Sequence, residues 1–106
     1  MFSVGVFAQK PEPHFEQDGA MLKATYFHEN GEVAQQGYFL NGNLHGNWVM
    51  FDQQGNKMAS GTYLQGEKSG KWFFWKAELL HEVDYAANRI VQVREWSRNG
   101  LVTAQQ

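Results

Sequence analysis

The sequence contains no cysteine and only 2 prolines among its 106 residues. The lack of cysteine excludes disulfide scaffolds, thiolate zinc sites, iron–sulfur clusters and thiol nucleophiles. No apolar run approaches the roughly 18 residues that a membrane-spanning helix needs. An excess of basic residues is also missing, since 9 Lys and Arg stand against 11 Asp and Glu. A strongly basic nucleic-acid binder is therefore not expected, because such proteins need net positive charge against phosphate.

Glycine and aromatic residues are abundant by contrast, with 11 glycines and 15% aromatics. They recur in register: segments 31–48 and 55–72 align with a shift of 24 residues, which maps Trp48 onto Trp72. Each half of this repeat predicts one strand and one turn. The half-period of 12 residues is carried by the aromatic series Phe15, Phe27, Phe39, Phe51, Tyr63 and Trp75.

Short strands separated by glycine-containing turns are the expected local structure. Asn30-Gly31, Asn41-Gly42 and Asn99-Gly100 are Asx-Gly dipeptides, which favour hairpin turns because both residues tolerate positive φ. A helix competes poorly because each interior glycine costs about 1 kcal/mol, and only residues 77–88 leave a helical turn open. The expected strands are Ala20–Phe27, Val33–Leu40, Asn47–Phe51, Lys57–Leu64, Lys71–Trp75, Leu80–Tyr85 and Ile90–Trp96.

The chain is expected to contain an N-terminal segment, residues 1–13, and one repeat domain, residues 14–106, whose repeats degenerate after residue 76. Residues 1–8 are apolar, and residues 6–8 have the small-x-small pattern that signal peptidase prefers. Two interpretations stay open. Residues 1–8 are the end of a signal peptide, which predicts an exported or periplasmic protein, or they form a short strand of a cytoplasmic protein.

The two most aromatic expected strands carry large apolar side chains on both faces. Because side chains alternate along a strand, Trp48 and Phe51 lie on opposite faces, and so do Trp72 and Trp75. One face is expected to build the core. The other is covered either by the coiling of the sheet, which we favour, or by a partner.

Two segments resemble MORN repeats: residues 37–48, Gly-Tyr-Phe-Leu-Asn-Gly-Asn-Leu-His-Gly-Asn-Trp, and residues 61–72, Gly-Thr-Tyr-Leu-Gln-Gly-Glu-Lys-Ser-Gly-Lys-Trp. More closely, residues 15–75 are similar to the bacterial MORN-variant repeats of the YwqK-like antitoxin family. The resemblance implies an elongated antiparallel meander of hairpins that is not an enzyme and serves as an interaction or dimerisation module. The toxin-neutralising label of the variant family implies a partner protein, and some MORN arrays are proposed to bind phospholipid headgroups.

The expected fold is therefore an all-β array of consecutive antiparallel hairpins. The expected function is a non-catalytic protein–protein interaction module, either antitoxin-like or accessory to the cell envelope. The candidate anchor residues are Trp48, Phe51, Trp72 and Trp75, because tryptophan is enriched where interfaces are desolvated. The partner and the oligomeric state stay open, and an edge-to-edge dimer is one option.

The alternative is binding to a membrane surface or to lipid headgroups through Lys68, Lys71 and Lys76. No cofactor or metal is expected, because no two histidines have the i, i+2 or i, i+4 spacing of zinc ligands. The serines show no nucleophile-elbow motif, and an enzyme is the least favoured class.

Overall fold

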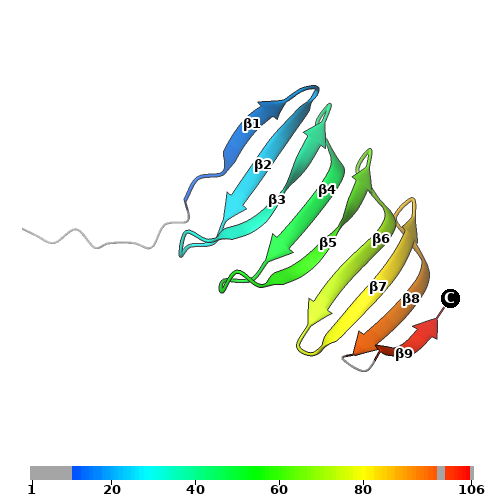
Figure 1. Ribbon diagram of the computed structural model, residues 1–106. Coiled ribbons are helices and arrows are strands. Elements are labelled where there is room, and N and C mark those ends of the chain that lie inside the picture. The colour runs from blue at the N-terminus through cyan, green and yellow to red at the C-terminus, as the bar shows by residue number, and fades with distance from the viewer. Residues whose placement is uncertain (1–10, 98–99, 106) are drawn as a thin grey trace, which may run out of the picture.

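The computed structural model describes residues 11–97 and 100–105, and the structural statements below concern these residues. They form one sheet of nine strands, in which each strand pairs antiparallel with the next along the chain (Figure 1). This open meander confirms the expected all-β array of hairpins. The strands are β1 (His14–Asp18), β2 (Met21–Phe27), β3 (Val33–Leu40), β4 (Asn43–Phe51), β5 (Lys57–Leu64), β6 (Glu67–Lys76), β7 (Leu79–Ala86), β8 (Arg89–Ser97) and β9 (Gly100–Gln105).

The sheet is a single elongated layer with extents of 63 × 36 × 19 Å. It twists steadily from β1 to β9, as antiparallel sheets of L-residues do (Figure 1). Within the described part of the chain, no helix and no second sheet covers either face. Among these residues, the core therefore has to form within one face of the sheet.

The expected turn glycines fix most of the hairpins. Asn41 and Gly42 have φ of 51° and 84°, and Gln65 and Gly66 have φ of 50° and 89°. Positive φ at both central residues is the conformation that matches the twist of two hairpin strands. The longer turns at 28–32 and 52–56 are also alike, since the first residue of each donates its amide to the carbonyl of the last at 2.8 Å.

Gly46 and Gly70 do not act as the sequence predicted. We expected both glycines to precede a strand, but β4 begins at Asn43 and β6 begins at Glu67. Both glycines adopt positive φ, 78° and 71°, at points where the register with the preceding strand shifts. They form β-bulges, which use the same backbone conformation as a turn glycine but continue the strand.

The chain after residue 76 does not form the helical turn that the sequence left open for residues 77–88. Residues Leu79–Ala86 form a strand, so no helical turn is present there. The turn into β8 contains Ala87 and Asn88, with φ of 49° and 72°, and no glycine. The interpretation of residues 1–8 and the first half of the Asn99-Gly100 turn lie outside the described residues.

Side chains alternate between the two faces of the sheet. We name one the indole face, which carries Trp48, Met50, Trp72 and Phe74, and the other the groove face, which carries Val49, Phe51, Phe73 and Trp75. The aromatic series divides between them, because its members lie on successive strands. Phe15, Phe39 and Tyr63 are on the indole face, and Phe27, Phe51 and Trp75 are on the groove face.

Trp48 and Trp72 form the centre of the core on the indole face. Their exposed fractions are 5% and 2%, and burial of such a side chain stabilises the fold by roughly 2–3 kcal/mol. Each indole lies against a glycine of the preceding strand, Gly37 for Trp48 and Gly61 for Trp72. Each indole N–H donates to a backbone carbonyl, at 3.0 Å to Tyr38 and at 2.9 Å to Thr62. The repeat in sequence is therefore a repeat in packing.

Candidate functional site

The groove face carries an open depression of about 550 Å³ that extends across β2 to β6. One row of its floor follows the register from Gln36 through Val49 and Ser60 to Phe73. A second row brings Thr62 beside Asn47, and the Thr62 hydroxyl donates to the Asn47 side-chain oxygen at 3.2 Å. Amide, hydroxyl and aromatic groups are thus interleaved on one surface, an arrangement that suits recognition of a partner with both polar and apolar groups.

Three lysines, Lys23, Lys57 and Lys71, line the depression, and no acidic residue does. In the described part of the chain, Lys23 and Lys57 form no ion pair. The ammonium group of Lys57 lies 5.5 Å from the centre of the Trp75 ring, a distance at which a cation and an aromatic face attract each other. The depression is therefore locally positive, although the chain has a formal charge of −2.

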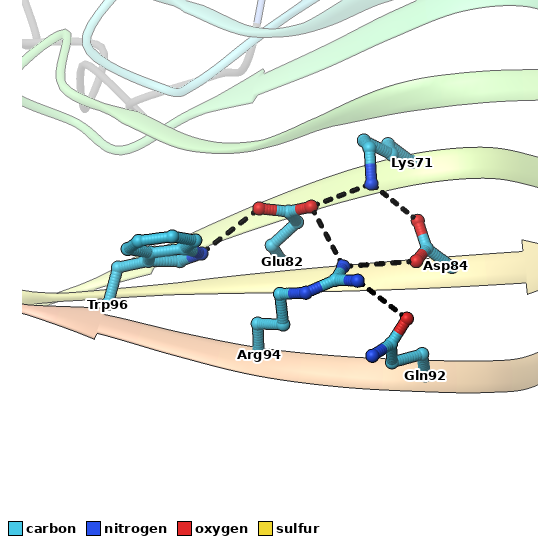
Figure 2. Close-up of polar contacts among 6 residues, drawn as sticks. All are labelled: Lys71, Glu82, Asp84, Gln92, Arg94 and Trp96. Carbon is cyan, nitrogen blue, oxygen red and sulfur yellow. Dashed lines mark hydrogen bonds and ion pairs between the residues drawn. The ribbon is translucent and has the colours of Figure 1, made fainter. Parts of the chain in front are cut away.

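The third lysine belongs to an ion-pair network at the border of the depression (Figure 2). Lys71 on β6 donates to Glu82 at 2.7 Å and to Asp84 at 3.0 Å, both on β7. Arg94 on β8 donates to the same two carboxylates at 3.2 Å. The Trp96 indole donates to the other Glu82 oxygen at 3.0 Å. Four charges from three neighbouring strands therefore compensate one another.

The network changes the pKa values of its members. The hydrogen bond from Lys71 is the main cause that lowers the pKa of Glu82, and burial opposes it. The same lysine lowers the pKa of Asp84. The hydrogen bond to Glu82 is the main cause that raises the pKa of Lys71. All three groups are therefore firmly charged at neutral pH, and Lys71 has little free charge to offer a ligand.

The indole face has a smaller hollow of about 200 Å³ between β2 and β6. Tyr26, Phe39, Leu44 and Tyr63 surround it, and Trp48 and Trp72 line it as well. Tyr63 contacts both indoles edge-on, with ring centres 6.1 Å and 5.0 Å apart. Burial raises the pKa of Tyr63, so its phenol stays neutral. These contacts hold the aromatic core together.

The structure separates the four tryptophan and phenylalanine residues that the sequence offered as anchors. Trp48 and Trp72 are buried, so their indoles present almost no surface to a partner, and we rest no binding proposal on them. Phe51 is half-buried, and Trp75 has an exposed fraction of 37%. These two share the groove face, but only Phe51 lines the depression.

The three lysines of the lipid hypothesis do not lie on one surface. Lys68 is on the indole face, where its ammonium lies 5.5 Å from the Trp72 ring and 5.3 Å from the Tyr85 ring. Lys71 is on the groove face within the ion-pair network. Lys76 follows Trp75 in β6 and so returns to the indole face. The sheet therefore divides this set between opposite faces.

Sequence reasoning missed Lys23, Lys57 and Phe73 as groove residues. Lys23 and Lys57 are 34 positions apart and are brought to one face by the pairing of four strands. Two signals in the sequence could have found them. Side chains alternate between the two faces along each strand, and the position of each turn predicts which residues of neighbouring strands pair. The bulges at Gly46 and Gly70 shift that register, so the turns alone would have misplaced residues on β4 and β6.

The described residues contain no group of three His, Asp or Glu side chains arranged to hold a metal ion. In the same part of the chain, no helix has the length and apolar character that crossing a membrane requires. In comparisons with known proteins, no protein-family model and no curated protein matches the sequence.

Proposed function

We propose that this chain is a non-catalytic module that binds another protein through the groove face of its sheet. The observation that carries the proposal is the surface across β2 to β6, where Phe51 and Phe73 lie among hydroxyl, amide and ammonium groups in one open depression. Interfaces of this kind have apolar anchors at the centre and polar groups that pair around them. The resemblance of residues 37–48 and 61–72 to MORN-variant repeats supports the same proposal, since arrays of this family are interaction modules.

An antitoxin-like role and an accessory role in the cell envelope are both compatible with such a module. Each of these roles requires a partner protein. We therefore propose only that the chain binds another protein, and do not choose between the two roles. Binding to lipid headgroups through Lys68, Lys71 and Lys76 gains no support from the geometry, because the first and last of these are on the opposite face from Lys71.

The experiment compares two exposed sites on opposite faces. Thr62 is exposed near the centre of the groove face, and Met50 is 41% exposed on the indole face. The immobilised chain and the variants Thr62→Glu and Met50→Glu are used to capture proteins from an extract of the native cells, with quantification by mass spectrometry. Both substitutions introduce the same side chain and the same negative charge, so each controls for the other.

The expected result is a protein retained by the original chain and by Met50→Glu, but reduced at least tenfold with Thr62→Glu. Each variant is first checked for its folded state by its NMR spectrum. Loss with Met50→Glu and retention with Thr62→Glu would move the binding surface to the indole face and refute the proposal. Equal capture by all three chains would refute it as well.

A further inference from the structure

We infer that the groove face takes an acidic, extended segment of the partner protein, whose carboxylates pair with Lys23 and Lys57 while its apolar side chains contact Phe51 and Phe73. This inference rests on the proposed function and specifies the chemistry of the partner. Charge complementarity carries it: the lining of the depression has two lysines without an ion pair, Lys23 and Lys57, and no acidic residue, in a chain that is acidic as a whole.

The two lysines differ from Lys71 and Arg94 in forming no ion pair with the described residues, although Glu16 of β1 lies opposite Lys23 in the register and the Lys57 ammonium lies over the Trp75 ring. Lys71 and Arg94 are both held by Glu82 and Asp84. Lys23 and Lys57 form no ion pair within residues 11–97 and 100–105. An incoming carboxylate therefore gains a cation at each of these lysines without breaking an existing ion pair.

The groups between the two lysines favour the same occupant. Ser60 lies in the floor, and its hydroxyl forms no hydrogen bond with the described residues, so it can donate to a carboxylate. Phe51 on β4 and Phe73 on β6 flank β5 from opposite sides and supply apolar contact area. A segment that is acidic and also carries apolar side chains can pair with the ammonium and hydroxyl groups and also contact the phenylalanine rings. A simple anion can pair only with the ammonium and hydroxyl groups.

The distances match a short extended segment. Lys23 is on β2 and Lys57 is on β5, so three strand spacings, roughly 14 Å, separate them across the sheet. Lys23 pairs with Tyr38, two residues from the Gln36–Val49 pair, and Lys57 pairs with Phe51, two residues beyond it on the other side, so the lysines are also displaced along the strand direction by about four residues, roughly 13 Å. An extended chain advances about 3.3 Å per residue, so a segment of about six residues connects the two lysines.

The test uses a short synthetic peptide of alternating Glu and Leu, with a Gln–Leu peptide of the same length as its neutral counterpart. Binding is followed by amide NMR shifts of the folded chain. The groove variant is K23Q/K57Q, and the matched control is K68Q/K76Q, which removes the same charge from the indole face. NMR spectra without peptide establish that both variants retain the fold.

The expected result is binding of the Glu–Leu peptide, with shifts that concentrate on groove residues of β2 to β6 and weaken as salt is raised. The K23Q/K57Q variant should lose about tenfold in affinity and the K68Q/K76Q variant less than about twofold, in line with a pair of partly exposed ion contacts. The inference is overturned if the Gln–Leu peptide binds equally well, if the Glu–Leu peptide does not bind, or if both variants lose affinity alike.

A further arm uses vesicles of phosphatidylserine and phosphatidylcholine. Vesicle binding that depends on Lys23 and Lys57, in the absence of peptide binding, would overturn the inference in favour of a membrane surface. The inference can fail while the proposed function stands: a captured protein that is lost with Thr62→Glu but kept with K23Q/K57Q would leave the binding module intact and remove only the acidic partner.

Discussion

Gly61 on β5 and the indole of Trp72 on β6 are in such close contact that a Cβ atom at residue 61 would overlap the ring carbons Cγ, Cδ2 and Cε2. Gly37 and Trp48 have the same relationship one repeat earlier. In both cases the glycine is needed for space, since neither has the positive φ of the turn glycines. The core of this single-layer sheet is thus built by covering glycine backbone with an indole from the next strand.

The first prediction follows from this contact. Gly61→Ala should destabilise the fold by about 3 kcal/mol, because the added methyl group displaces the Trp72 ring and breaks its hydrogen bond to the Thr62 carbonyl. The free energy of unfolding is measured by urea denaturation. Ser60→Ala, on the same strand but on the open face, is the control and should change stability by less than about 0.5 kcal/mol. An equal effect of both substitutions would contradict the packing described.

The second prediction separates core tryptophan from surface tryptophan. Trp72→Ala should cost about 3–5 kcal/mol, because it removes a side chain with an exposed fraction of only 2%. Trp75→Ala should cost about 1 kcal/mol, since it removes a partly exposed ring that contacts Phe73 and Lys57. Thermal unfolding of both variants checks this. Similar losses would mean that both indoles are structural.

The hairpin order was predictable from sequence because turn chemistry and aromatic spacing are local signals. The strands Val33–Leu40 and Lys57–Leu64 were expected with the boundaries that the structure shows. The first residues of β4 and β6 were not, because Gly46 and Gly70 have positive φ for a different reason, a bulge within a strand. Sequence alone does not distinguish a bulge glycine from a turn glycine.

The candidate site was less predictable than the fold. The alternation of side chains shows that Trp48 and Phe51 occupy opposite faces, but it does not show which face buries its aromatics. That choice depends on Gly37 and Gly61, whose missing side chains leave space on one face only. Once the indoles fill that space, Phe51 and Trp75 are left on the open face with Lys57.

The third prediction concerns the turn without glycine. Ala87 has φ of 49°, a left-handed conformation that costs an alanine roughly 1–2 kcal/mol. Asn41 occupies the corresponding first position of its turn with φ of 51°. Ala87→Asn should therefore stabilise the fold by about 0.5–1 kcal/mol.

Asn88, the second residue of this turn, is left unchanged in the same experiment, because it also forms hydrogen bonds to β6. Its amide donates to the Lys68 carbonyl at 2.9 Å, and its side-chain oxygen accepts from the Lys68 amide at 3.0 Å. Equilibrium unfolding in urea measures the effect of Ala87→Asn. A loss of stability would show that strain at residue 87 is not what limits this hairpin.

The last prediction concerns the ion-pair network and acid pH. The pKa of Glu82 is lowered from 4.5 and that of Asp84 from 3.8, in each case chiefly by the hydrogen bond from Lys71. Since a lowered folded-state pKa favours the ionised form, their contribution is complete above about pH 4.5 and is lost as the pH falls through the lowered values. Lys71 has a raised pKa, so its contribution is complete below pH 10.5 and is lost above it.

Stability should therefore fall between pH 5 and pH 2, and Glu82→Gln should reduce that fall, because glutamine keeps the acceptor for Trp96 but cannot titrate. Glu67→Gln is the matched control, since Glu67 is exposed and forms no ion pair with the described residues. Urea midpoints of the three chains across this pH range measure the effect. If Glu67→Gln flattens the acid limb as much as Glu82→Gln does, the network is not the cause of the pH dependence, because a carboxylate outside it would then contribute equally.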